Sequence, residues 1–83
     1  MKYYTYILYS ENLDKYYVGY TSTSLDERLR KHNTNHKGFT GRTNDWKVAY
    51  VESFETKKDA YARERAIKAK KSRSYIEQLI AHR

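Results

Sequence analysis

Two tyrosine-rich runs with a short polar turn between them constrain the fold of this chain most. Residues 3–9 and 15–21 consist largely of Tyr, Thr, Ile, Leu and Val, which favour β-strands. Residues 11–14 include Asn and Asp, whose side chains readily bond their own backbone in turns. This pattern predicts an antiparallel hairpin. Because alternate residues of a strand face opposite sides, some of these tyrosines must be buried and others exposed.

Helical signals follow the hairpin, with one further strand among them. Three pairs of residues have the spacing of helix capping boxes, in which the first side chain satisfies an amide of the first turn. Residues 46–54 form a third strand-like run, and the alternation predicts that Val48 and Tyr50 share one face. The capping pairs are Ser24 with Glu27, Thr56 with Asp59, and Ser74 with Glu77.

The resulting element order is β-β-α-β-α-α. We therefore expect an α+β fold in which a three-stranded antiparallel sheet is flanked by helices. A chain of 83 residues predicts a single domain covering residues 1–83. The absence of Cys excludes a disulfide framework and a thiolate metal site. No apolar run is long enough to span a bilayer and the N-terminus lacks a signal-peptide pattern, so we expect a cytoplasmic protein without membrane association.

Positive charge is concentrated in the last third of the chain. The formal net charge is +7, and residues 57–83 hold 9 Lys and Arg against 3 Asp and Glu. A localised positive field attracts polyanions, of which nucleic acid is the most common. An anionic membrane surface and a solvated basic helix without a specific partner are the alternatives. Exposed tyrosines beside such a surface could stack on bases, or could simply be good strand formers.

Glu64 lies at an unusual place in its helix. Its neighbours at helical spacing, Ala60 and Ile67, define the expected inward face, where a carboxylate is costly unless it is paired or binds a cation. One carboxylate together with water and phosphate is a common way to hold Mg²⁺. The alternative is an exposed Glu beside Arg63 and other basic residues, and periodicity alone favours this second interpretation.

Arg28 and His32 lie four residues apart, so both side chains point from one face of the first helix. An arginine offers a planar fork of donors suited to phosphate oxygens, and a histidine can act as an acid or a base. A surface arginine and a histidine at a helix end are the more common explanation of such a pair. Gly19, within a strand, predicts a bulge or the close approach of another group.

Taken together, these features resemble the GIY-YIG nuclease family, over nearly the whole chain. Tyr17-Val18-Gly19 keeps the second half of the family motif, whereas the first half retains only Tyr6. The segment 25–33 resembles the helix that follows the motif, and residues 46–50 and 60–71 continue the match. The resemblance is greatest to small stand-alone bacterial members. It aligns Arg28 and His32 with the arginine and histidine of the family, and Glu64 with its metal-binding glutamate.

The resemblance implies a three-stranded antiparallel sheet with flanking helices and a metal-dependent cleavage of DNA. It implies that Tyr17 assists the nucleophilic water and that Tyr6 positions this water or the phosphate. It further implies that Arg28 neutralises charge on the scissile phosphate and that His32 supports the phosphate or a proton transfer. Glu64 would hold Mg²⁺, or Mn²⁺ in its place, and no small-molecule organic cofactor is expected.

Our first hypothesis is therefore a divalent-metal-dependent endonuclease that hydrolyses DNA phosphodiester bonds, with branched or damaged DNA as the substrate considered. A non-catalytic nucleic-acid-binding module that keeps the fold is the alternative. A protein-interaction domain with an acidic partner is a third hypothesis. We expect a monomer or a weak homodimer. The residues expected to contact nucleic acid are all basic: Arg30, Lys31, His36, Lys37, Arg63, Lys68, Lys71 and Arg73.

Overall fold

A three-stranded antiparallel sheet with helices on both faces forms the centre of the protein in a computed structural model that describes residues 2–34 and 39–82. The strands are β1 (Tyr3–Ser10), β2 (Lys15–Thr21) and β3 (Lys47–Phe54), in the order β2-β1-β3. The helices are α1 (Leu25–His32), α2 (Lys57–Ala69) and α3 (Arg73–Ala81), and a short 3₁₀ turn, η1 (Phe39–Arg42), precedes β3. The predicted α+β fold and element order are confirmed.

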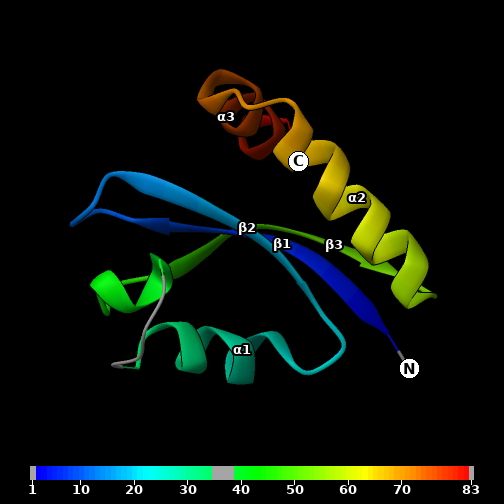
Figure 1. Ribbon diagram of the computed structural model, residues 1–83, viewed down its shortest axis with the longest axis horizontal. Helices are drawn as coiled ribbons and strands as arrows, with labels where there is room; N and C mark the ends of the chain where they lie inside the picture. The colour runs from blue at the N-terminus through cyan, green and yellow to red at the C-terminus, as the bar shows by residue number, and fades with distance from the viewer. Residues whose placement is uncertain (1, 35–38, 83) are drawn as a thin grey trace.

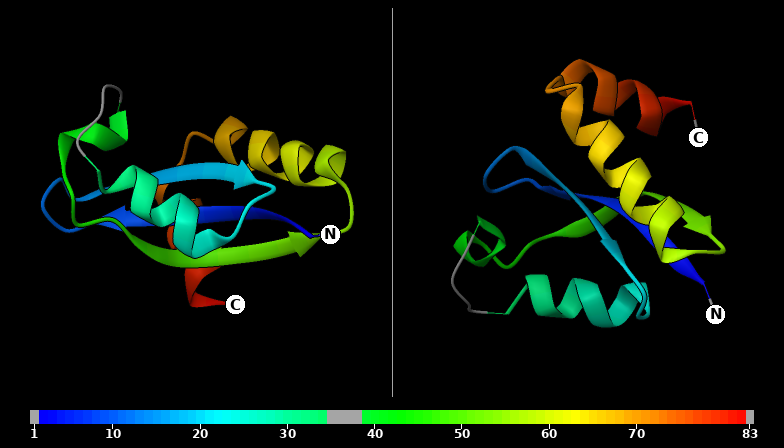
Figure 2. Two further views of the ribbon diagram at one scale, coloured as in Figure 1. Left: turned by 90° about the horizontal axis from the view of Figure 1, so that it is seen from below. Right: turned by 45° about the vertical axis from the view of Figure 1, so that its right-hand side comes forward.

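The sheet separates α1 from the other two helices. Figures 1 and 2 show α1 below one face, and α2 and α3 together above the opposite face. Since β1 is the central strand, it is covered on both sides, and four consecutive residues, 5–8, are buried. Among the described residues, no helix is long and apolar enough to cross a membrane.

Each face of the sheet carries its own hydrophobic cluster. On the α1 side, Tyr6, Leu8 and Trp46 are buried, and Leu25 and Leu29 of α1 pack against them. On the other side, the buried residues are Ile7, Val18 and Ile67, with partly buried residues of α3 around them. The alternation of the hairpin therefore directs Tyr6 and Ile7 into different layers, as a strand with both faces covered requires.

The prediction that Val48 and Tyr50 share one face of β3 is wrong. The register shifts between Ile7 and Leu8, so that Ile7 pairs with Tyr50 whereas Leu8 pairs with Val48. One extra residue on β3 at this point reverses the alternation. Val48 consequently lies on the α1 side of the sheet and Tyr50 on the opposite side.

Two of the three predicted helix starts are confirmed. The Ser24 hydroxyl accepts a hydrogen bond from Glu27 N at 3.2 Å, and the Thr56 hydroxyl accepts one from Asp59 N at 3.1 Å. The predicted start at Ser74 is wrong, because Ser72 caps α3 by accepting from the amide of its third residue at 3.1 Å. Lys71, just after the end of α2, has a left-handed φ of 48°, and Ser72 follows it in the extended conformation of a cap.

The segment before β3 is tied to the end of α1 and to the hairpin. The Asn33 side chain accepts a hydrogen bond from Trp46 N at 2.7 Å and donates one to Trp46 O at 2.9 Å. The neighbouring Asp45 carboxylate accepts hydrogen bonds from Ser10 Oγ, Asn12 N and Thr43 Oγ1. These contacts hold the C-terminal end of α1 against the sheet, where the candidate site lies.

Replacing Asp45 with asparagine should lower the melting temperature at pH 7, and this deficit should shrink as the pH falls. The hydrogen bonds from Ser10, Asn12 and Thr43 lower the pKa of Asp45 from 3.8 to about 2. A depressed pKa in the folded state adds stability above pH 3.8, and this contribution is lost as the pH falls through about 2. Thermal melts from pH 7 to pH 2 measure the effect. A constant deficit at every pH would contradict it, with Glu11→Gln as the control.

Candidate active site

A buried tyrosine hydroxyl is the centre of the candidate site. Tyr6 projects from the central strand toward α1, and its side chain is only 1% exposed. Its Oη lies 2.9 Å from His32 Nε2, with which it shares a hydrogen bond, and Arg28 Nε donates a second hydrogen bond to it at 3.4 Å. The arginine and histidine predicted to share a helix face therefore converge on one phenol.

α1 is held in place so that these two side chains reach the sheet. Leu25 and Leu29 pack against the cluster around Tyr6, and both lie on the same helix face as Arg28 and His32. His32 is buried, although it stands in the last turn of the helix. The common explanation of a solvated histidine at a helix end is therefore wrong here.

Tyr17 joins the site from the adjacent strand β2. Its ring centroid lies 4.9 Å from that of His32 and 6.4 Å from that of Trp46. Lys68 Nζ, from α2, lies 5.8 Å from the centroid of the Tyr17 ring. Tyr17 therefore lies between His32 of α1 and Lys68 of α2.

Glu64 is buried, with only 7% of its surface exposed. It shares the inward face of α2 with Ala60 and Ile67, so the exposed alternative, which periodicity favoured, is wrong. One of its carboxylate oxygens lies 3.6 Å from Lys68 Nζ. Its negative charge also raises the pKa of Tyr6, so α2 and α1 contribute to one site.

The environment of Tyr6 keeps its hydroxyl protonated at neutral pH. Burial is the largest effect and raises the pKa of Tyr6, and the neighbouring Tyr17 and Glu64 raise it further. The hydrogen bond and the charge of Arg28 act in the opposite direction but do not outweigh burial. The pKa of Arg28 is itself raised, chiefly by the hydrogen bond to Tyr6. At neutral pH the site therefore contains a neutral phenol beside a permanent cation.

Gly19 is required by the position of Tyr6. The two residues are direct partners across β1 and β2. A Cβ atom at Gly19 would lie 2.7 Å from Tyr6 Oη, 2.8 Å from Tyr6 Cζ and 3.0 Å from Tyr17 Cε2. The predicted close approach is confirmed, and the approaching groups are the two tyrosines of the site.

Replacing Gly19 with alanine should destabilise the protein by about 1–3 kcal/mol, because overpacking forces neighbouring side chains out of their preferred rotamers. The new methyl group should also displace the Tyr6 hydroxyl from His32. Urea denaturation measures the loss of stability, and the NMR shifts of the His32 ring report the displacement. Unchanged shifts would contradict the expectation, and Gly41→Ala, outside the sheet, is the control.

The basic residues predicted to bind nucleic acid fall into two groups. Arg30 and Lys31 are exposed on α1, and Lys31 lines an open pocket of about 350 Å³ together with Arg28, His32 and Thr34. Lys68 borders the site from α2. Lys31 and Lys68 therefore lie beside the candidate site, whereas Arg30, two residues from both Arg28 and His32, points from the opposite face of α1. His36 and Lys37 lie outside the described residues.

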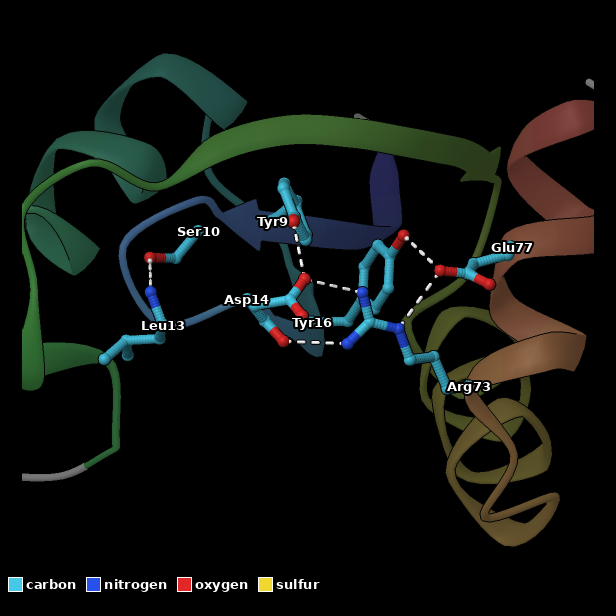
Figure 3. Close-up of polar contacts among 7 residues, drawn as sticks. All are labelled: Tyr9, Ser10, Leu13, Asp14, Tyr16, Arg73 and Glu77. Carbon is cyan, nitrogen blue, oxygen red and sulfur yellow. Dashed lines mark hydrogen bonds and ion pairs between the residues drawn. The ribbon is translucent and has the colours of Figure 1, made fainter.

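The remaining predicted contacts are placed elsewhere. Arg63 binds the Glu52 carboxylate of β3 through Nε and Nη2, and Lys71 lies in the turn between α2 and α3. Arg73 Nη2 lies 2.6 Å from Asp14 Oδ1, and its Nε donates to Glu77 at 3.1 Å (Figure 3). The structure does not bring these three residues to the candidate site.

Figure 3 shows that Arg73 ties the hairpin turn to α3. Asp14 also accepts a hydrogen bond from the Tyr9 hydroxyl at 2.7 Å, and Tyr16 donates to Glu77 at 3.3 Å. The Arg73 guanidinium lowers the pKa of Asp14. The sequence did not reveal this cluster, because its members are distant along the chain and only the turn-forming Asp14 carried a local signal.

The residues of the site fit a magnesium ion bound by a single carboxylate. Within the part of the chain that the structure describes, no group of three or more His, Asp or Glu side chains could enclose a metal ion. Mg²⁺ commonly uses one or two carboxylates and completes its shell with water and substrate phosphate. Glu64 is the one buried carboxylate among the described residues, so it is the candidate ligand.

The fold is that of a nuclease-type domain. The family model of the GIY-YIG catalytic domain matches residues 2–77, and the chain belongs to this family. It is also similar to the solution NMR structure of a UPF0213 protein from Bacillus halodurans, with 29% identity and a TM-score of 0.60. The match covers 100% of this chain and 86% of that one. No curated protein matches the chain.

Proposed function

We propose that this protein is a divalent-metal-dependent endonuclease that hydrolyses phosphodiester bonds in DNA. The observation that carries the proposal is the convergence of Arg28 and His32 on the buried Tyr6 hydroxyl, within electrostatic range of Glu64. These groups come from three separate elements, α1, β1 and α2, and the family to which the chain belongs is one of nuclease domains.

Arg28 is the residue that would neutralise the scissile phosphate. The Tyr6 hydroxyl accepts from its Nε, which orients the guanidinium, and Arg28 lines the open pocket beside Lys31 and His32. Phosphoryl transfer depends mainly on positioning and on stabilising the charge of the transition state. A cation held by a hydrogen bond before the substrate arrives needs no reorganisation during the reaction.

Tyr17 would assist the attacking water, and His32 would support the phosphate or a proton transfer. Because Tyr6 stays protonated, it orients His32 and Arg28 rather than removing a proton. Tyr17 packs on the His32 ring at 4.9 Å and lies beside Lys68, so these groups would position the attacking water. A general base must lie within hydrogen-bond reach of the proton that it removes, directly or through one water.

Glu64 would hold the divalent cation, Mg²⁺ or Mn²⁺. When bound, such a cation supplies neutralising charge to the phosphate and lowers the pKa of bound water. Lys68, 3.6 Å from the carboxylate, balances the buried charge of Glu64 in the absence of the cation. A purely DNA-binding module gains nothing from a carboxylate that faces phosphate, because the two anions repel each other.

Incubation of the purified protein with a panel of DNA substrates tests this function. The panel contains supercoiled, linear, single-stranded and branched DNA, each with Mg²⁺, with Mn²⁺ and with a chelator. We expect cleavage with either metal and none with the chelator, and branched DNA to be cut fastest. Binding without cleavage of every substrate would instead support the non-catalytic module, and cleavage in the chelator would overturn the metal dependence.

A further inference from the structure

A second pair of tyrosines lies on the edge of the sheet beside α2. Tyr20 of β2 and Tyr61 of α2 meet edge to face, with ring centroids 5.3 Å apart and an interplanar angle of 69°. Tyr61 is 46% exposed, so one side of its ring is open to a ligand. Neither residue belongs to the site described above.

The two tyrosines line an open pocket of about 300 Å³ together with Lys57 and Lys58. Arg65 adds a third cation, and its Cζ lies 6.0 Å from the centroid of the Tyr61 ring. The pocket therefore combines aromatic surface with positive charge. Binding sites for single-stranded nucleic acid have this composition, because bases stack on aromatic rings while cations hold the backbone.

Helix stability does not explain why two lysines occupy the first turn of α2. Lys57 and Lys58 stand in the first turn of α2, where the helix dipole disfavours positive charge. Across residues 2–34 and 39–82, no ion pair involves either lysine. Their charge is therefore available at this end of the helix for an anion from outside the chain.

The pocket lies beside Glu64, on the α2 side of the candidate active site. Tyr61 precedes Glu64 by three residues, which is about 4.5 Å along the helix axis. On β2, Tyr20 directly follows Gly19, the cross-strand partner of Tyr6, so its side chain lies on the α2 face of the sheet. A nucleic-acid strand with its scissile phosphate near Glu64 would therefore place a neighbouring nucleotide close to the two tyrosines.

We propose that the pocket formed by Tyr20, Tyr61, Lys57 and Lys58 binds an unpaired nucleobase of DNA next to the scissile phosphate. The protein would consequently select DNA with a single-stranded segment, since the bases of an intact duplex are stacked and cannot offer a face to the ring of Tyr61. This inference rests on the proposed nuclease function for the position of the cut, but the binding itself does not require catalysis.

Binding of DNA measured in the presence of a chelator tests the inference apart from any cleavage. The probes are a single-stranded oligonucleotide, a duplex with a single-stranded flap and a blunt duplex. Tyr61→Ala should weaken binding of the first two probes by about ten-fold, and binding of the blunt duplex by less than about two-fold. Tyr61→Phe, which keeps the ring, should bind all three like the wild type.

Two further readouts separate stacking from a general loss of charge or fold. A 2-aminopurine base in the single-stranded flap should lose fluorescence on binding to the wild type and keep it with Tyr61→Ala. Lys57→Ala should reduce the salt dependence of single-strand binding, with a slope smaller by about 0.7, because one phosphate contact is removed. Thermal melts establish that the variants fold, as expected for exposed positions.

The inference is overturned if Tyr61→Ala weakens all three probes equally, if it weakens none, or if the wild type does not bind single-stranded DNA. The proposed function can fail separately. If the wild type cleaves DNA but Tyr61→Ala binds all probes normally, the pocket proposal fails and the nuclease proposal stands. If Tyr61→Ala selectively loses single-strand binding but the wild type cleaves no DNA, the pocket proposal stands and the nuclease proposal fails.

Discussion

Arg28→Ala should lower the single-turnover rate of DNA cleavage by about 100- to 1,000-fold, the usual loss when one group that stabilises transition-state charge is removed. The guanidinium is bound to the Tyr6 hydroxyl and lines the pocket that includes His32, and in the proposed function it is the cation that meets the phosphate. The fold should survive, because the leucines of α1 hold the helix against the sheet. Rapid-quench measurements at saturating protein report the rate without the binding step.

Arg30→Ala is the matched control for this variant. Arg30 stands on the same helix, carries the same charge and is exposed. It should weaken DNA binding modestly and leave the single-turnover rate within about two-fold of the wild type, as expected for a contact that contributes equally to ground state and transition state. Equal rate losses in the two variants would show that Arg28 acts only through general charge.

Glu64→Gln should abolish metal-dependent cleavage while DNA binding is kept or becomes tighter. The substitution preserves the size of the side chain but removes the charged ligand that Mg²⁺ prefers. It also releases Lys68, now 3.6 Å from the carboxylate, for contact with phosphate. Cleavage rates measured with Mg²⁺ test the loss of activity, and dissociation constants measured in a chelator test the binding.

Glu27→Gln, an exposed glutamate on α1, controls for the loss of one negative charge. It should leave cleavage at the wild-type rate. If Glu64→Gln cleaves as fast as the wild type, Glu64 is not part of the site. If it neither cleaves nor binds, and its melting temperature is much lower, the carboxylate serves the fold rather than the chemistry.

The overall fold was predictable because its signals are local. The hairpin follows from two runs of strand formers around a turn, and the caps at Ser24 and Thr56 follow from their spacing to Glu27 and Asp59. The start of α3 was not predictable in this way. Ser72 and Ser74 offer competing caps two residues apart, and the left-handed turn at Lys71 decides between them.

The candidate site was predictable only in part, because burial and pairing depend on contacts between distant segments. Spacing placed Arg28 and His32 on one face, but only the packing of α1 shows that both reach Tyr6. Periodicity alone favoured an exposed Glu64, whereas the packing of α2 on the sheet buries it.

Contacts between distant segments also explain why several of the predicted basic residues lie away from the site. A count of charges cannot distinguish Lys68, which lies beside Glu64 at the site, from basic side chains whose acidic partners lie elsewhere. Arg63 binds Glu52 of β3, and Arg73 binds Asp14, which lies 59 residues earlier in the chain. Such partners are invisible to local patterns, so the overall positive charge indicated the class of ligand better than it indicated the contact surface.

A Mg²⁺ titration of the cleavage rate, for the wild type and for Glu64→Asp, tests the central claim most directly. The shorter side chain keeps a carboxylate but withdraws it from its present position. If Glu64 holds the cation that the reaction needs, the half-maximal Mg²⁺ concentration should rise in the variant, and high Mg²⁺ should restore much of the rate. An unchanged half-maximal concentration with a uniformly lower rate, or wild-type cleavage that persists in a chelator, would contradict a metal-dependent nuclease with Glu64 as the ligand.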